Sequence, residues 1–201
     1  MSVILASQSA VRAHLLKAAG VSFEIVAANL NESIIRDEIR RTSAGGEDLA
    51  MTAARALARE KARLVSERHP KAVVLGVDQT LSCEGKLYEK PADIDAARAS
   101  LLALRGKTHQ LYVAISAMRG GQSLWQHSET VRLVMRDFSD EFLEDYLKSE
   151  STRLLSYVGA YALEGRGSQL FKKVDGDYFS VLGIPLLPLL AFLRAEGELV
   201  E

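Results

Sequence analysis

Residues 72–77 (AVVLGV) form an apolar run that continues directly into Asp78 and Gln79 without an intervening turn residue. Such a run is typical of a strand that is fully buried in a sheet. A carboxylate is a poor strand former and is costly to bury. The run therefore predicts a buried strand over residues 71–82. The carboxylate of Asp78 on such a strand needs an explanation.

The composition narrows the class of protein. The chain has 201 residues, of which 48% are hydrophobic and 25% charged, so it can bury a sizeable core and predicts a single domain, residues 1–201. Its net charge of −1 argues against a broad nucleic-acid surface, although not against a local basic pocket. The chain shows neither a signal peptide nor 18 uninterrupted apolar residues, so we expect a cytoplasmic protein that does not contact the membrane.

Strand and helix patterns alternate along the chain and then include a hairpin. Periodicity and capping residues predict strands over residues 3–6, 22–28, 71–82 and 168–174, a hairpin of 109–118 with 123–136, and helices over 9–20, 33–41, 48–68, 93–104, 139–149 and from about 185. This mixture predicts an α/β fold with a mixed sheet.

A serine-rich turn between the first predicted strand and helix is a candidate anion site. Ser7 and Ser9 supply hydroxyls, and the helix that begins after them supplies free backbone N–H groups and a positive dipole end. Arg12 lies in the first helical turn, where a cation opposes the dipole, so it suits a residue that reaches towards a phosphate. The alternative is an ordinary helix cap followed by a solvent-exposed arginine.

Two acids are candidate metal ligands. Asp78 is expected at the carboxyl end of its strand, where open α/β sheets place their ligands. Glu32 follows another predicted strand in a polar loop. Because Mg²⁺ is usually bound by one or two carboxylates together with substrate phosphates, the two acids could share one ion. A helix cap or a surface charge is the alternative for each.

Two lysines have suggestive settings. Lys61 lies on an alanine-rich helix face that would let it approach a neighbouring element closely, and Lys90 precedes a proline in the loop after the Asp78 strand. An exposed position is the simpler interpretation of Lys61 on its own. The four histidines form no zinc-binding pattern, and the single cysteine, Cys83, excludes an internal disulfide and a multi-cysteine metal site.

Several motifs, taken in order, are similar to those of the Maf family. They are LASQSAVRAHLL, NE at positions 31–32, REKA, GVDQT, EKPAD, RGKTH, VGAYALEG and FKKVDGDYFSVLGIPLLPLL. The resemblance spans residues 3 to about 193. It implies a nucleoside triphosphate pyrophosphatase that cuts between the α- and β-phosphates and needs a divalent cation, Mg²⁺ or Mn²⁺. It also implies an elongated, bent mixed sheet with two lobes around a deep cleft, similar to the inosine triphosphate pyrophosphatases, and a homodimer.

The resemblance assigns roles to the candidate residues. It implies that the triphosphate is bound by Ser7, Ser9 and Arg12, that the metal is bound by Glu32 and Asp78, and that the catalytic residues are Asp78, Lys61 and Lys90. Asp78 matches the family's general base. A strand that delivers this carboxylate to a metal and water would explain the acid that follows the apolar run.

The chain departs from the family pattern at three places. The usual Ser-Pro-Arg-Arg is SAVR at residues 9–12, so one of two arginines is missing. Asp-Glu is replaced by Asn31-Glu32, and Asp-Lys-Ala-Gly by SYVG at residues 156–159, which removes a charged pair. The role of these departures, including Ser156 and Tyr157, is left open by the sequence.

Two positions bear on the choice of nucleotide. The Maf branch that acts on 7-methyl-GTP carries Gln after the aspartate and Glu in a later motif, as Gln79 and Glu164 do here. A carboxylate also suits the N–H donors of a positively charged 7-methylguanine. The alternatives are that Glu164 only caps the turn at 165–167, that dTTP or UTP is the substrate, and that the protein is a nucleotide-binding regulator of septum formation.

Overall fold

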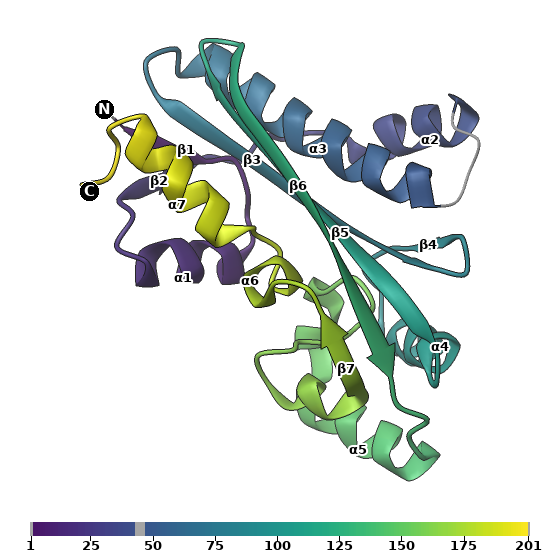
Figure 1. The fold of residues 1–201 in the computed structure, drawn as a ribbon. Helices are drawn as coiled ribbons and strands as arrows, with labels where there is room; N and C mark the ends of the chain where they lie inside the picture. Colours follow the sequence, from purple (N-terminus) through teal and green to yellow (C-terminus); the bar gives the residue numbers. More distant parts are fainter. Residues whose placement is uncertain (1, 43–46, 201) are drawn as a thin grey trace.

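The computed structural model describes residues 2–42 and 47–200; residues 1, 43–46 and 201, which the predicted domain range includes, lie outside the described part. Its strands form one mixed sheet in the order β2-β1-β3-β5-β6-β7, with β4 paired to β3 beside that path (Figure 1). The strands are β1 (Val3–Leu5), β2 (Phe23–Ile25), β3 (Val73–Cys83), β4 (Lys86–Tyr88), β5 (Thr108–Arg119), β6 (Gln122–Met135) and β7 (Phe171–Asp175). The predicted α/β class with a mixed sheet is confirmed.

Helices flank this sheet on both faces. They are α1 (Ala10–Ala18), α2 (Glu32–Thr42), α3 (Glu47–Arg68), α4 (Ile94–Leu104), α5 (Asp140–Glu150), α6 (Tyr178–Val181) and α7 (Leu186–Ala195), with 3-10 helices η1 (Ser151–Ser156) and η2 (Arg166–Leu170). The long strands β3, β5 and β6 connect two groups of helices, with α1, α3 and α7 towards one end and α4 and α5 at the other (Figure 1). In the described part, no helix combines the length and the apolar character that crossing a membrane requires.

Strand β3 differs from the prediction in a way that matters for the site. The predicted bounds, 71–82, agree closely with β3, but the expectation that Asp78 lies at the carboxyl end is wrong, because Asp78 lies in the middle of the strand. On one edge, β5 pairs with β3 from Val74 to Ser82. On the other edge, β1 covers residues 73–75 and β4 covers residues 81–83. Residues 76–80 therefore lie at a gap between two partner strands, and Asp78 is at the centre of that gap.

Alternation along β3 sends its side chains to opposite faces of the sheet. Val77 packs in an apolar cluster with Leu16 of α1 and Leu189 of α7. Gly76 instead faces α3, where a Cβ atom would lie 2.1 Å from the carbonyl oxygen of Ala58. Asp78, two residues after Gly76, shares the α3 face.

The alanine-rich face of α3 allows the helix to approach β3 closely. Ala50, Ala54 and Ala58 are buried against side chains of β5. This packing confirms that small side chains bring α3 near another element, and it places Lys61, one turn beyond Ala58, above the centre of β3.

Several local predictions are confirmed, whereas the short elements β4 and α6 were not predicted. The side chains of Ser9, Asp93 and Ser139 cap α1, α4 and α5 as expected. The strand predicted over residues 168–174 is wrong in its first part, because residues 166–170 form η2 and β7 starts only at Phe171.

Candidate active site

A large open pocket of about 1170 Å³ lies at the gap in β3. Its walls come from the β1–α1 turn, α2, α3, β3, the loop after β4, and η1. Eight of the nine predicted site residues line it: Ser7, Ser9, Arg12, Glu32, Lys61, Asp78, Gln79 and Lys90. Taken together, the lining has six basic and four acidic side chains, so the pocket is locally basic in a chain of nearly neutral charge.

Asp78 lies buried at the inner wall of this pocket, with only 5% of its surface exposed. Its Oδ1 accepts a hydrogen bond of 2.6 Å from Nζ of Lys61. Its Oδ2 is buried and has no hydrogen-bond partner among the described residues. A buried carboxylate oxygen is costly to leave unpaired, so Oδ2 is the atom of this site most in need of a ligand.

Lys61 joins the two predicted acids. Its Nζ lies 2.6 Å from Asp78 Oδ1 and 2.7 Å from Glu32 Oε1, and its side chain is only 13% exposed. The interpretation of Lys61 as an exposed surface lysine is therefore wrong. The ammonium balances part of the negative charge that the two carboxylates bring into the pocket.

Glu32 is the first residue of α2 and does not lie in a loop. Burial raises the pKa of Glu32, but Lys61 and Arg36 outweigh burial and lower that pKa to about 2. Arg36 lies one turn along α2 and donates to Glu32 Oε2 at 2.9 Å. Glu32 is thus an ionised carboxylate that is held by two cations. The alternative, an isolated charge on the surface, does not describe it.

Hydrogen bonds of its guanidinium hold the Arg12 side chain inside the protein. Its Nε donates to the carbonyl oxygen of Gly183 at 2.7 Å, and its Nη1 donates to the carbonyl oxygen of Val77 at 3.0 Å and to the Ser7 hydroxyl at 3.1 Å. Burial lowers the pKa of the guanidinium, and the carboxylates of Asp78 and Glu32 oppose that change. The alternative of a solvent-exposed arginine is wrong, and contact with a phosphate stays a prediction.

Hydroxyls of the β1–α1 turn lie beside Arg12. Ser9 accepts a hydrogen bond from the backbone N–H of Arg12, which confirms it as the cap of α1, and Ser7 accepts from the backbone N–H of Ser9. Lys90 lies on the exposed side of the same pocket, as expected for a loop residue. Partial burial and the charge of Arg12 lower the pKa of Lys90.

Glu164 lies with Gln79 in a small cavity of about 30 Å³ that adjoins the large pocket. The Gln79 amide donates to the carbonyl oxygens of Ser180 and Val181 at 2.9 and 3.1 Å. Glu164 Oε1 accepts from the Tyr157 hydroxyl at 3.0 Å. The 3-10 helix η2 begins after Gly165, which has no side chain to cap it, and the alternative that Glu164 caps the turn at 165–167 stays open.

The sequence patterns did not identify three of the six basic residues that line the large pocket, namely Arg36, Arg40 and Arg153. Arg36 and Arg153 both line the large pocket, and Arg153 also lies 3.4 Å from Glu164 Oε1. The i,i+4 spacing of Glu32 and Arg36 is a signal that could have identified Arg36. Arg153 pairs with Glu150 at the i,i+3 spacing, whereas its second partner, Glu164, lies beyond the end of η1.

The acids present suit a hard divalent cation that is shared with a substrate. No group of three or more His, Cys, Asp or Glu residues suited to a metal occurs in the described part of the chain. Two carboxylates are nevertheless sufficient for Mg²⁺ when phosphates and water complete its ligands. The unpaired Asp78 Oδ2 is the observation that fits such an ion.

Comparison with known proteins gives the family. The Maf-like protein family matches residues 2–196. The chain belongs to the Maf family. Two similar Maf relatives, from Granulibacter bethesdensis and Paramagnetospirillum magneticum, are each 46% identical and are named nucleoside triphosphate pyrophosphatase. The alignments cover 99% of both chains for the first, and 98% of this chain and all of the relative for the second.

A third Maf relative carries a more specific name. The protein from Brucella abortus biovar 1 is 44% identical over 98% of this chain and 96% of its own, and is named 7-methyl-GTP pyrophosphatase. A solved structure of a HAM1 protein from Coxiella burnetii covers 69% of this chain and 74% of its own at 14% identity and a TM-score of 0.38, a likeness too remote to support an argument.

Proposed function

We propose that this Maf protein is a nucleoside triphosphate pyrophosphatase that hydrolyses the α–β phosphate bond, and that 7-methyl-GTP is its preferred substrate. The names of its relatives support the reaction. The single observation in the structure that carries the proposal is the buried Asp78 at the inner wall of a basic pocket: one of its oxygens is paired with Lys61, and the other accepts no hydrogen bond from the described residues.

The triphosphate would lie along the cationic side of the pocket. Ser7, Ser9 and Arg12 stand at the N-terminus of α1, where hydroxyls and the positive end of the helix dipole favour an anion. Lys90, on the exposed side, would neutralise the outer phosphates. Its lowered pKa reflects partial burial near Arg12, and a phosphate anion would favour its protonated form.

Glu32 and Asp78 would hold the divalent cation. Such an ion supplies charge stabilisation to a phosphoryl oxygen. The chain's own contribution is to position Asp78 by means of Lys61, so that its carboxylate accepts the proton of the attacking water. The proton would therefore rest on Asp78 while the α–β bond breaks and pyrophosphate leaves.

Glu164 and Gln79 would recognise the base from the adjoining cavity. The Glu164 carboxylate is held by Tyr157 and suits the N–H donors of a guanine whose ring is positively charged. This cavity of about 30 Å³ is too small for a purine base, so side chains around it must move when a base binds. Tyr157 and Val158 line both the cavity and the large pocket, and they stand where that movement would open the two into each other.

The test is pyrophosphate release from a panel of nucleoside triphosphates in the presence of Mg²⁺ or Mn²⁺. We expect the highest kcat/KM with 7-methyl-GTP, followed by GTP, and lower values with dTTP and UTP. A preference for dTTP or UTP would contradict the choice of base and leave the reaction in place. Tight binding of nucleotides without turnover would contradict the reaction and favour a nucleotide-binding regulator.

A further inference from the structure

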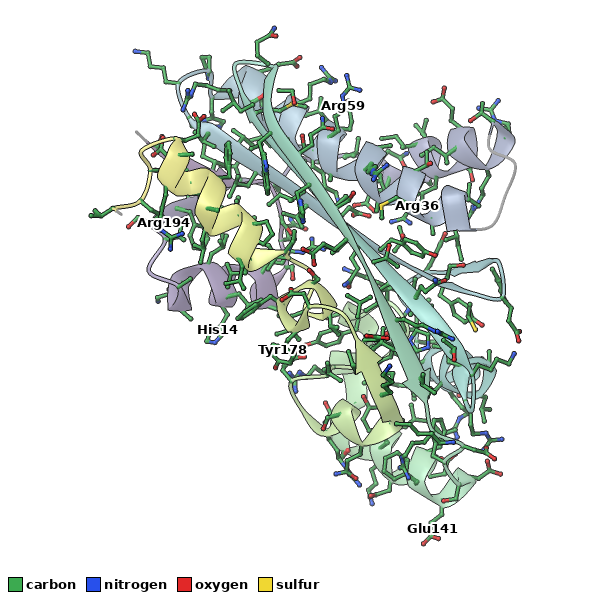
Figure 2. The ribbon with its side chains drawn as sticks, in the orientation of Figure 1. His14, Arg36, Arg59, Glu141, Tyr178 and Arg194 are labelled. Carbon is green, nitrogen blue, oxygen red and sulfur yellow. The ribbon has the colours of Figure 1, made fainter. Side chains whose placement is uncertain are left out.

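Arg36 is turned into the pocket from a helix whose other basic residues are more exposed. Its side chain is 19% exposed, whereas that of Arg40, one turn further along α2, is 46% exposed. In Figure 2, Arg36 lies between α2 and the strands, while Arg59 of α3 points away from the sheet on the outer side. Arg36 and Arg40 both line the pocket, and Arg36 is the more buried of the two.

Four charged side chains from three elements form a closed ring at the inner wall of the pocket. Arg36 Nη2 lies 2.9 Å from Glu32 Oε2, and Lys61 Nζ lies 2.7 Å from Glu32 Oε1 and 2.6 Å from Asp78 Oδ1. Arg36 Nη2 closes the ring at 3.9 Å from Asp78 Oδ2. Each carboxylate thus faces both cations, and the formal charges of the ring cancel.

The ring contains more than an ordinary helical ion pair. An exposed i,i+4 pair contributes only a few tenths of a kcal/mol to a helix. Arg36 also faces Asp78, a buried residue of another element, across a distance too long for a hydrogen bond. Asp78 Oδ2 is the oxygen without a hydrogen bond, so Arg36 lies beside the reactive atom of the proposed site without occupying it.

We propose that Arg36 is a triphosphate-binding residue, which neutralises Glu32 and Asp78 in the free protein and passes to the phosphates when nucleotide and metal bind. The inference rests on the proposed function. A divalent cation on the two carboxylates repels the guanidinium beside it, and the incoming phosphates offer anionic oxygens in its place. A guanidinium matches a phosphate with two parallel hydrogen bonds, which an ammonium such as that of Lys61 cannot make.

The exchange explains how one pocket can serve as both a metal site and an anion site. Without ligand, the neutral ring avoids leaving the buried carboxylate of Asp78 uncompensated beside the partly exposed carboxylate of Glu32. With metal bound, the positive charge of Arg36 is released towards the substrate. The affinity that Arg36 contributes should therefore depend on the metal.

The test is calorimetric binding of a non-hydrolysable 7-methyl-GTP analogue with an α,β-methylene bridge. With Mg²⁺, Arg36→Ala should weaken binding about 10- to 100-fold, the range expected for a hydrogen bond to a charged group. Arg59→Ala, on the outer side of α3, is the matched control and should bind as the wild type does. With EDTA in place of Mg²⁺, the loss caused by Arg36→Ala should be several-fold smaller, because Arg36 then stays on Glu32.

Circular dichroism checks that each variant is folded. If Arg36→Ala does not fold, the binding test is made with Arg36→Gln, because glutamine can still form a hydrogen bond to Glu32 but carries no charge. Affinity within twofold of the wild type in a folded Arg36 variant would overturn the inference, and so would equal losses with Mg²⁺ and with EDTA. Turnover by the wild type tests the proposed function separately: a protein that binds the analogue through Arg36 but releases no pyrophosphate contradicts the function and not this inference.

Discussion

Gly76→Ala tests whether close packing of α3 on β3 positions Lys61, which we propose as a catalytic residue. An alanine Cβ at position 76 would lie 2.1 Å from the carbonyl oxygen of Ala58, 2.5 Å from the backbone nitrogen of Ala62 and 2.9 Å from its Cβ. Two of these atoms belong to the helix backbone, which cannot rotate away as a side chain can. The helix must therefore withdraw by roughly 1 Å to restore ordinary contact distances.

The withdrawal should affect both stability and activity. Overpacking of this kind costs about 1–3 kcal/mol, and the backbone contacts place Gly76→Ala near the upper value. In urea unfolding, the midpoint should fall by roughly 1 M with an unchanged slope. The Lys61–Asp78 contact of 2.6 Å would lengthen with the helix, and a displacement of that size can lower kcat by about 10²-fold.

Gly165→Ala is the control for the effect on stability. Its backbone φ of −128° suits alanine, and its Cβ would lie in ordinary contact, 3.5 Å from Nη1 of the Arg153 side chain. We expect its unfolding midpoint to match that of the wild type. A Gly76→Ala protein with the wild-type midpoint and kcat would refute the idea that this close approach positions the site.

Four further variants test other parts of the site and the core. Asp78→Asn should lower kcat for pyrophosphate release at least ~10²-fold while circular dichroism stays unchanged; retention of more than a tenth of the activity would exclude Asp78 as the base. Arg12→Ala should lower the urea midpoint, because the guanidinium joins distant segments of the backbone, and it should also weaken nucleotide binding. Wild-type nucleotide affinity in calorimetry would remove Arg12 from the site. Glu164→Gln combined with Gln79→Thr should shift kcat/KM from 7-methyl-GTP towards UTP and dTTP, and an unchanged ranking would count against base recognition by this pair. Burial lowers the pKa of His109 from 6.5 to about 4. This histidine should therefore reduce the unfolding free energy by up to ~3 kcal/mol as the pH falls from 6.5 to 4. Urea titrations at several pH values should show this dependence in the wild type and not in His109→Gln.

The elements with strong local signals could be predicted from the sequence. The capping hydroxyl of Ser139 marks the start of α5, and the two glycines at 120–121 separate the strands of the β5–β6 hairpin. The order of the motifs along the chain also indicates the Maf family. These features depend on residues close together in the chain, so a single sequence contains them.

Other features depend on neighbours that no local pattern reports. The three-residue strand β4 and the four-residue helix α6 are too short to carry a periodicity of their own. Asp78 was expected at a strand end, where open α/β sheets place their ligands, whereas it lies within the segment of β3 that pairs with β5. Lys61 looks exposed in isolation, and only the packing of α3 on Gly76 reveals that it is paired with Asp78.

The identity of the phosphate products is the most direct test of the proposed reaction. Wild-type protein would be incubated with 7-methyl-GTP and Mg²⁺, and the products would be resolved by phosphorus NMR, with Asp78→Asn as the inactive comparison. We expect equal amounts of 7-methyl-GMP and pyrophosphate from the wild type, and neither from the variant. Formation of orthophosphate and a nucleoside diphosphate, or no conversion of any triphosphate in the panel, would contradict the proposed reaction.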